Sequence, residues 1–489
     1  MSRDRHISST AACCGKREVT SRMALLKKVA YAGGGLALGY LGWTVFGDAA
    51  EIRRNEGRGK GKTFLVIGAG FAGLAAAAEL ARLLPDSSNG DIVLVDEDNF
   101  LLFTPMLTEA AGGELDSRHI LRSLQKVSKR IRFVQGSVTE IHLAEKTVTV
   151  QRGGEGTNLP PLQFAADHIL IAVGSVTNFH GIPGLAETAI PMKNLEDASQ
   201  VNERVLACLR EASLETDTAR KRALLTFVVA GGGYTGVETM AAVNGLIRSR
   251  IHEYPAIAPR DVQTILINPG DRLLNEINPD LASYAADKLK QHGVQIRMKT
   301  KVSAATESHV EGNGAERIPT RTLIWAAGVK PTPIVEPLRC EKGRHGGIKV
   351  DACCQVPGHP GIWAIGDCAE IPRAHGKGAY APTVQNASRE GKQVAHNIVA
   401  FLHGMPARPF NYTPIGELAL VGRHSGVARI YGHNFSGPVA WAMWRAIYLA
   451  KMPGTGQKAR ILSDWVLDLI FGRDPIATNA GTSAYKGEA

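Results

Sequence analysis

The chain has 489 residues, of which 44% are hydrophobic and 21% are charged. This length exceeds what one compact core usually holds and predicts two or three globular domains, and the composition argues against a disordered chain and a small disulfide-stapled scaffold. The 56 Lys and Arg residues outnumber the 46 Asp and Glu residues, which gives a net charge of +10. This charge is compatible with binding to nucleic acid, to an anionic membrane surface or to phosphorylated cofactors, and it does not distinguish among them.

The N-terminal segment divides into a basic stretch and an apolar one. Residues 1–28 are polar and basic without apolar periodicity, which predicts a disordered N-terminus or a stretch upstream of an alternative start at Met23. Residues 29–47 carry no charge and have about the length of a membrane-spanning helix, so they are a candidate transmembrane anchor. A signal-peptide-like segment and a packed helix remain alternatives. Basic residues flank this segment on both sides, so the orientation stays open.

A first glycine-rich turn follows a short apolar run at Thr63–Ile67, which is typical of a buried parallel strand. The turn reads GxGxxG and leads into a run of strong helix formers. A second strand-like run, Ile92–Asp96, ends in an acid that can accept a hydrogen bond from a ribose hydroxyl. Strand, turn, helix and terminal acid together predict a dinucleotide site that comprises Gly68, Gly70, Gly73 and Asp96.

The same arrangement recurs after the apolar run Leu225–Val229. Its glycines are Gly231, Gly233 and Gly236, and they predict a second dinucleotide site. The following strand ends in Asn268 where an acid is expected. A neutral amide binds a ribose hydroxyl without repelling a 2′-phosphate, so NADPH stays possible beside NADH.

Further strand-like runs lie between and after the two turns, with helical patterns between several of them, at His168–Ala172, Gln263–Ile267, Thr322–Ala326 and Gly361–Ile365. Alternation of this kind predicts an α/β fold with parallel sheets. The last run continues into Gly366 and Asp367, which by themselves also fit a plain strand and turn.

The C-terminal segment holds two amphipathic patterns. Val439–Lys451 places Trp441, Trp444 and Tyr448 on one helical face, with Arg445 and Lys451 expected on the other side. A second apolar stripe stands opposite two acids and comprises Ile461, Leu462, Trp465, Val466, Leu469 and Ile470. We interpret both as interfacial helices at a membrane surface, with a dimer interface or ordinary core as the alternative.

These motifs together resemble the two-dinucleotide flavoprotein reductases and, more narrowly, the type II NADH dehydrogenases, which are single-chain NADH:quinone oxidoreductases. The resemblance covers roughly residues 64–475. Besides the motifs above it is carried by Asn99–Leu107, Gly113–Ile120, Ile182–Gly184 and the crossovers ending at Gly174 and Gly328.

The resemblance implies two Rossmann-like domains, with the NAD(P)H domain inserted into the FAD domain. It implies FAD on the first glycine turn, NADH on the second, and contact between Asp367 and the ribityl chain of FAD. The expected segments are an FAD domain at 63–193 and 336–408, an NAD(P)H domain at 194–335, and a C-terminal region at 409–478 for membrane docking and dimer contacts.

The resemblance also implies individual site residues. Glu238 matches a glutamate near the flavin and the approach of the quinone, although it also fits a helix-surface carboxylate. Gly328 is expected beside the nicotinamide. Gln385 matches the first of two glutamines that contact quinone, and Arg389 replaces the second, so the contact to a quinone carbonyl becomes charge-assisted or is lost. No metal is required.

The expected function is transfer of hydride from NADH to FAD and of two electrons onward to a membrane quinone, without proton pumping. The expected location is the inner or cytoplasmic membrane, with the catalytic domain facing the cytoplasm and a homodimer as the assembly. Disulfide reduction is disfavoured because no cysteine lies between Phe100 and Gly113, and sulfide oxidation could use only Cys353 or Cys354. Reduction of a ferredoxin- or rubredoxin-type protein and a non-catalytic NADH sensor remain alternatives; no aromatic and basic motif supports nucleic-acid binding.

Overall fold

The computed structural model describes residues 61–84, 90–153, 159–314, 316–374 and 378–471, which belong to one compact unit that begins at Arg58. The predicted basic N-terminus at 1–28 and the candidate anchor at 29–47 lie outside the described residues. Within the described ranges, no helix combines the length and the apolar character that a bilayer crossing requires.

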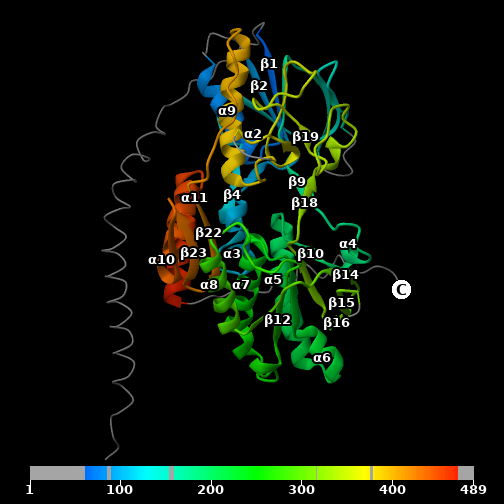
Figure 1. The fold of residues 1–489 in the computed structure, drawn as a ribbon, viewed down its shortest axis with the longest axis vertical. Coiled ribbons are helices and arrows are strands. Elements are labelled where there is room, and N and C mark those ends of the chain that lie inside the picture. The colour runs from blue at the N-terminus through cyan, green and yellow to red at the C-terminus, as the bar shows by residue number, and fades with distance from the viewer. Residues whose placement is uncertain (1–60, 85–89, 154–158, 315, 375–377, 472–489) are drawn as a thin grey trace, which may run out of the picture. The chain divides into compact units, whose positions relative to one another are not determined.

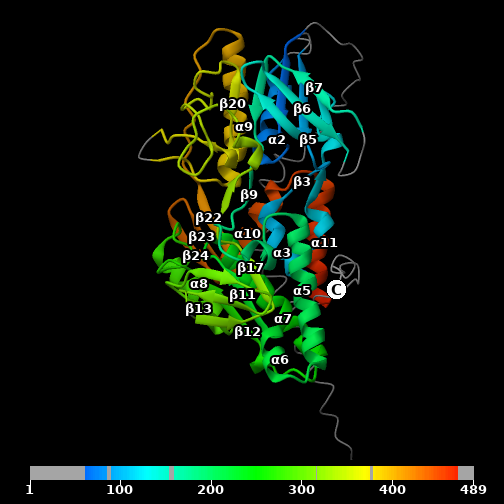
Figure 2. The same cartoon turned by 90° about the vertical axis from the view of Figure 1, so that its right-hand side faces the viewer.

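The first sheet has seven strands in the order β20-β8-β1-β2-β5-β6-β7. Its first five strands are parallel, and β6 and β7 add an antiparallel meander to the far end of β5 (Figure 2). The strands are β1 Thr63–Ile67, β2 Asp91–Asp96, β5 Ile131–His142, β6 Thr147–Arg152, β7 Leu162–Ala165, β8 His168–Ile171 and β20 Ile362–Ala364. Because β20 comes from far downstream and pairs with β8, the first unit resumes after an insertion, and the predicted nesting is confirmed.

Two helices pack side by side against this sheet: α2, Phe71–Leu83, and α9, Val384–Leu402 (Figure 1). Their axes approach closely because α9 carries Gly391 at the contact. A Cβ atom built there would lie 2.3 Å from the Ala72 carbonyl oxygen, so any larger residue would push the helices apart.

The inserted sheet is parallel throughout, in the order β10-β17-β11-β12-β13. Its strands are β10 Ile190–Pro191, β11 Thr226–Ala230, β12 Gln263–Ile267, β13 Val294–Arg297 and β17 Thr322–Trp325. It carries α5 Leu195–Leu214, α6 Thr218–Leu224, α7 Tyr234–Arg250, α8 Pro279–Gln291 and the meander β14 Val302–Ala305, β15 His309–Gly312 and β16 Glu316–Pro319. The sheet already includes β10, slightly ahead of the boundary expected at 194.

Two short crossover strands connect the units and pair antiparallel, β9 Ser175–Thr177 and β18 Val329–Pro331. They follow Gly174 and Gly328, both of which adopt positive φ. The remaining short elements are β3 Phe100–Leu102, β4 Leu121–Ser123, α3 Leu107–Ala111, α4 Leu185–Thr188, β19 Ile348–Lys349 and β21 Ala369–Glu370.

The C-terminal region begins with an antiparallel meander of β22 Gly416–Gly422, β23 Ser425–Ile430 and β24 His433–Ser436. Two helices follow, α10 Gly437–Lys451 and α11 Thr455–Phe471. Trp444 of α10 and Trp465 of α11 belong to the same hydrophobic core as the inserted sheet. This region is thus packed onto the dinucleotide-binding units.

Candidate functional site

The first glycine turn is closed on two sides and open on the third. A Cβ at Gly68 would lie 2.3 Å from the Ala172 carbonyl oxygen, and one at Gly73 would lie 1.9 Å from the Gly68 carbonyl oxygen. A Cβ at Gly70, by contrast, would meet nothing within 4 Å. The outer glycines therefore let strand and helix pack closely, and the middle one leaves space at the N-terminus of α2, where a pyrophosphate is stabilised.

The second turn repeats this geometry. A Cβ at Gly231 would lie 2.4 Å from the Ala326 carbonyl oxygen, one at Gly236 would lie 1.9 Å from the Gly231 carbonyl oxygen, and one at Gly233 would meet nothing. Each turn thus leaves open space at the N-terminus of its helix, at Gly70 before α2 and at Gly233 before α7. We call these two open spaces the glycine cradles.

Alanine at the middle glycine of each turn should separate the two cradles. Neither Gly70→Ala nor Gly233→Ala introduces a clash within the protein, so both variants should fold, while the added methyl group occupies the approach of the phosphates. We expect Gly70→Ala to lose FAD during purification. Gly233→Ala should keep FAD and raise the KM for NADH about tenfold. Flavin content and steady-state kinetics check this, and loss of FAD from Gly233→Ala alone would contradict the assignment of the turns.

The polar residues that end the two neighbouring strands are both bound to their own loops. Asp96 accepts hydrogen bonds from the backbone N–H groups of Ala69 and Asp98, at 2.5 and 2.9 Å, and burial raises its pKa to about 6. Asn268 is buried, and its Nδ2 donates to the Arg272 carbonyl at 2.9 Å. Each side chain therefore fixes the loop of its turn.

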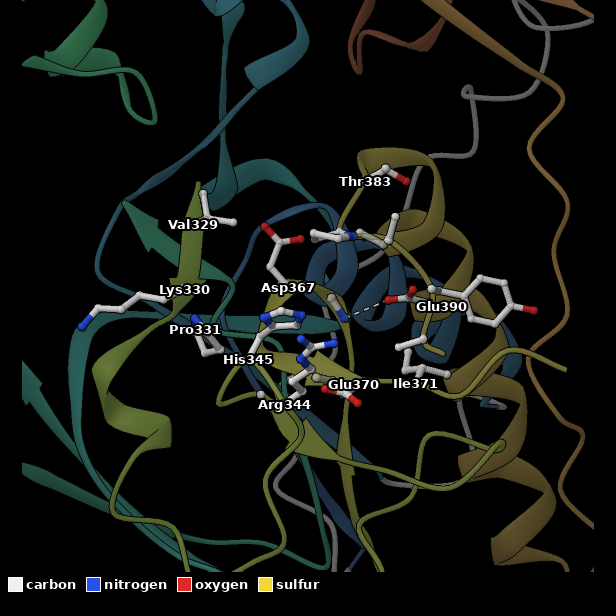
Figure 3. A pocket seen from close by; sticks show the side chains of 18 of the residues that line it. Val329, Lys330, Pro331, Arg344, His345, Asp367, Glu370, Ile371, Thr383 and Glu390 are labelled. Carbon is white, nitrogen blue, oxygen red and sulfur yellow. Dashed lines mark hydrogen bonds between the residues drawn. The ribbon is translucent and has the colours of Figure 1, made fainter. Parts of the chain in front are cut away.

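Strand β20, which ends at Ala364, brings Gly366 and Asp367 to the edge of a cavity of about 420 Å³ (Figure 3). The Gly366 N–H donates to Glu390 Oε2 at 2.8 Å, and burial raises the pKa of Glu390 to about 7. Glu390 is a residue of this site that was not predicted from the sequence. Gly174 lies at the start of the nearby crossover with open space around it.

Asp367 is held by two residues that the sequence analysis missed. Ser175 Oγ donates to Asp367 Oδ2 at 2.6 Å, and Lys193 Nζ lies 2.8 Å from that hydroxyl and 3.5 Å from the same carboxylate oxygen. No spacing rule joins these positions, because they meet only through the tertiary fold.

Glu238 does not lie on a helix surface as the alternative interpretation had it. Its Oε1 accepts hydrogen bonds from the Leu420 N–H at 2.9 Å and from Trp444 Nε1 at 3.2 Å. Burial outweighs both contacts and raises the pKa of Glu238 to about 8. At pH 7 this side chain is therefore a neutral acid that can donate a proton. Gly328, at φ +135°, lies against His180 in the crossover that follows β17.

The expected quinone-contacting residue Gln385 is bound within the protein. Its Nε2 donates to the Gly416 carbonyl at 3.1 Å, and its Oε1 accepts from the Tyr412 hydroxyl at 3.0 Å. Arg389 donates to the Gln385 backbone carbonyl and stacks over the Tyr412 ring, with Cζ 4.0 Å from the centroid. In this arrangement Gln385 attaches α9 to the C-terminal region.

The orientation expected for α10 is wrong in one respect. Arg445, expected opposite the tryptophans, points inward and bonds Glu109 and Glu114, each at 3.0 Å. Its guanidinium lies between the rings of Trp441 and Trp465, 4.4 and 4.6 Å from their centroids. The aromatic face of α10 thus forms core, as the alternative interpretation held, because it covers a buried ionic cluster.

The stripe expected on α11 divides between core and surface. Ile461 and Trp465 are buried. Asp464, which was expected opposite the apolar stripe, also faces the protein and lies 2.6 Å from His119 Nδ1. The exposed apolar side chains of this helix are Leu462, Val466, Leu467, Leu469, Ile470 and Phe471. An apolar surface of this kind is typical of a contact with lipid or protein.

The residues present fit a dinucleotide flavin and a nicotinamide dinucleotide. The two open cradles at Gly70 and Gly233 accept pyrophosphates, and the cavity at Asp367 offers a carboxylate to a hydroxylated chain. Among the described residues, no three His, Cys, Asp or Glu side chains gather as metal ligands.

Comparisons with known proteins agree with this geometry. Residues 62–391 match the pyridine nucleotide-disulphide oxidoreductase family, and residues 415–474 match the NDH2 C-terminal domain. A type II NADH:quinone oxidoreductase of Mycobacterium tuberculosis is 30% identical over 424 residues, which cover 84% of this chain and 88% of the relative. A probable NADH dehydrogenase of Dictyostelium discoideum is 29% identical over 87% of this chain and 94% of the relative. The solved structure of NDH2 from Plasmodium falciparum in complex with NADH has the same fold, with a TM-score of 0.77 at 19% identity over 85% of this chain and 99% of that one.

Proposed function

The chain belongs to the pyridine nucleotide-disulphide oxidoreductase family, within its type II NADH:quinone oxidoreductases, and from this we infer that it is an enzyme that oxidises NADH and reduces a quinone. Its cofactor is FAD, as the family implies, and FAD supplies the chemistry that takes hydride from NADH and passes two electrons on. The observation that carries this function is the pair of open glycine cradles in one chain, joined by the two paired crossover strands.

For the individual residues we propose the following roles. Gly68, Gly70, Gly73 and Asp96 bind the ADP part of FAD, and Gly174, Gly366 and Asp367 bind its remaining length. Gly231, Gly233, Gly236 and Asn268 bind NADH. Gly328 lets the nicotinamide approach, and Glu238 donates a proton to the quinone. Gln385, held by Tyr412, positions the start of α9 beside the quinone, and Arg389 supplies a cation there; their contacts within the protein support these two roles.

Asn268 should set part of the preference between NADH and NADPH. The variant Asn268→Asp places a negative charge where the 2′-phosphate of NADPH would lie, so its kcat/KM for NADPH should fall about tenfold relative to that for NADH. The variant also loses the hydrogen bond to the Arg272 carbonyl, at a stability cost of about 1–3 kcal/mol. Steady-state kinetics with both nucleotides check the ratio; an unchanged ratio would show that Asn268 does not sense the ribose.

We further propose that α11 docks onto the membrane surface and that the chain forms a homodimer. The exposed apolar side chains of α11 support the docking, since their burial in lipid is favourable, and the net charge of +10 favours anionic lipids. The inner or cytoplasmic membrane, with the catalytic units on the cytoplasmic side, follows as the proposed location.

The alternative functions are not favoured. Cys354 is buried and Cys353 is partly buried, and burial raises the pKa of both thiols, which opposes the thiolate that sulfide oxidation requires. Reduction of a small redox protein would leave the apolar surface of α11 without a purpose, and a non-catalytic sensor would not need a neutral carboxyl at Glu238.

Steady-state assays of detergent-solubilised protein with NADH and a short-chain quinone test the function. The expected result is NADH oxidation that depends on the quinone and on bound FAD. Absence of turnover in a protein that holds FAD and binds NADH would overturn it in favour of a sensor.

A further inference from the structure

A lysine from the inserted unit contacts the acid that lines the FAD cavity of the first unit. Lys193 lies between β10 and the start of α5, Ser175 opens β9, and Asp367 follows β20. The Lys193 Nζ to Ser175 Oγ distance is 2.8 Å and the Ser175 Oγ to Asp367 Oδ2 distance is 2.6 Å. Three distant segments therefore form one chain of hydrogen bonds that joins the two units.

The direction of these hydrogen bonds is fixed by the groups involved. An ammonium only donates and a carboxylate only accepts, so the Ser175 hydroxyl must accept from Lys193 and donate to Asp367. With a charged group at each end, both bonds are stronger than neutral ones. Both contacts use Oδ2 of Asp367, which leaves Oδ1 for a ligand in the cavity.

The lysine is held in place by its own backbone. The Lys193 N–H donates to Asp197 Oδ2 at 2.7 Å, within the capping box that Asn194 and Asp197 form at the N-terminus of α5. The ammonium group thus extends from a fixed helix end toward Asp367. A shift of α5 would therefore change the distance between Lys193 and Asp367.

A second lysine, Lys330, lines the cavity itself and is paired with a different acid. Lys330 extends away from Asp367 (Figure 3), and its Nζ lies 3.9 Å from Glu336 Oε1. Among the contacts of the described residues, the cation brought to Asp367 is Lys193.

We propose that Lys193 is a positioning residue of the flavin site, which acts through Ser175 to orient Asp367 toward the ribityl chain of FAD. Its charge also makes the site more favourable for added electrons, because a cation near a flavin stabilises the reduced cofactor. This inference rests on the proposed function, since it takes FAD as the ligand of the cavity.

The test compares Lys193→Met and Lys193→Arg with Lys290→Met, a matched control on the exposed face of α8. On the purified holoenzymes, FAD release on dilution gives the dissociation constant and spectroelectrochemistry gives the flavin midpoint potential. Lys193→Met should raise the FAD dissociation constant about tenfold and shift the potential to more negative values, because a charge-assisted contact is lost. Lys193→Arg should restore most of the wild-type FAD affinity and most of the wild-type flavin potential.

A second variant separates orientation from charge. Ser175→Ala keeps the lysine and removes the relay, so it should weaken FAD binding while shifting the potential less than Lys193→Met does. If wild-type flavin is reduced by NADH and Lys193→Met matches Lys290→Met in both measurements, the inference is overturned and the proposed function stands. Wild-type protein that binds no FAD would overturn both.

Discussion

Replacing Glu238 by glutamine should slow reduction of the quinone about 10²- to 10³-fold and leave reduction of the flavin by NADH nearly unchanged. Formation of a quinol requires two protons as well as two electrons, and Glu238 is the neutral buried acid that the structure places between α7, β22 and α10. Glutamine keeps the acceptor oxygen for the Leu420 N–H and for Trp444, so the fold should persist. It cannot release a proton.

The pH dependence of the wild-type enzyme follows from the same residue. Since the pKa of Glu238 is raised to about 8, the acid is protonated below this value and loses its proton above it. The rate of quinone reduction should therefore fall as pH rises through about 8, and the Glu238→Gln variant should lack this decline. Stopped-flow measurement of each half-reaction checks both statements, with Glu211→Gln on the exposed side of α5 as the control. A variant that keeps the wild-type quinone rate would refute the proton-donating role.

Replacing Arg445 by methionine should lower the free energy of unfolding by about 3–5 kcal/mol, because it leaves the buried carboxyl group of Glu109 and the partly buried one of Glu114 without their cation. The side chains of Glu109 and Arg445 are only 2% and 11% exposed. Methionine retains the apolar stem but removes the guanidinium from the rings of Trp441 and Trp465, so the loss includes the cation–π contacts as well as the ion pairs. The double variant Glu109→Gln/Arg445→Met should recover part of the loss.

Denaturation by guanidinium followed by tryptophan fluorescence checks this prediction. The control is Lys290→Met, whose ion pair with Asp287 spans 3.7 Å and is more than half exposed on both sides, and its expected change is below about 1 kcal/mol. Equal midpoints for Arg445→Met and Lys290→Met would contradict the account of the cluster.

Glu109 also gives stability a pH dependence of known sign. Burial raises its pKa above the ordinary value of 4.5, so the folded protein binds the proton more tightly than the unfolded chain does. The stabilisation is complete below about pH 4.5 and is lost as pH rises through the higher folded value. Stability should thus decline toward alkaline pH, and Glu109→Gln should flatten that part of the curve.

The two dinucleotide-binding units were predictable because their signals are local. Gly68, Gly70 and Gly73 lie in one turn between a buried strand and a helix of small residues. Gly68 and Gly73 have no room for a side chain in that turn, so the spacing of the glycines alone predicts it. The nesting of one unit in the other followed from the resemblance, and the pairing of β20 with β8 confirms it.

The polar contacts of the site were not predictable in the same way. Lys193, Ser175 and Asp367 are joined only by the tertiary fold, and Gln385 is bound by Tyr412 from a segment that carries no motif. Arg445 was misplaced for a different reason. It stands one helical turn after Trp441 and hence on the same face, but its charge suggested solvent, and nothing in α10 alone reveals Glu109 and Trp465 as its partners.

Anaerobic mixing of the purified protein with NADH, followed by addition of a quinone, tests the central claim most directly. We expect the yellow colour of the bound flavin to bleach on addition of NADH and to return when the quinone is added. A flavin that stays oxidised in the presence of NADH, or one that bleaches but is not reoxidised by any quinone, would contradict the account.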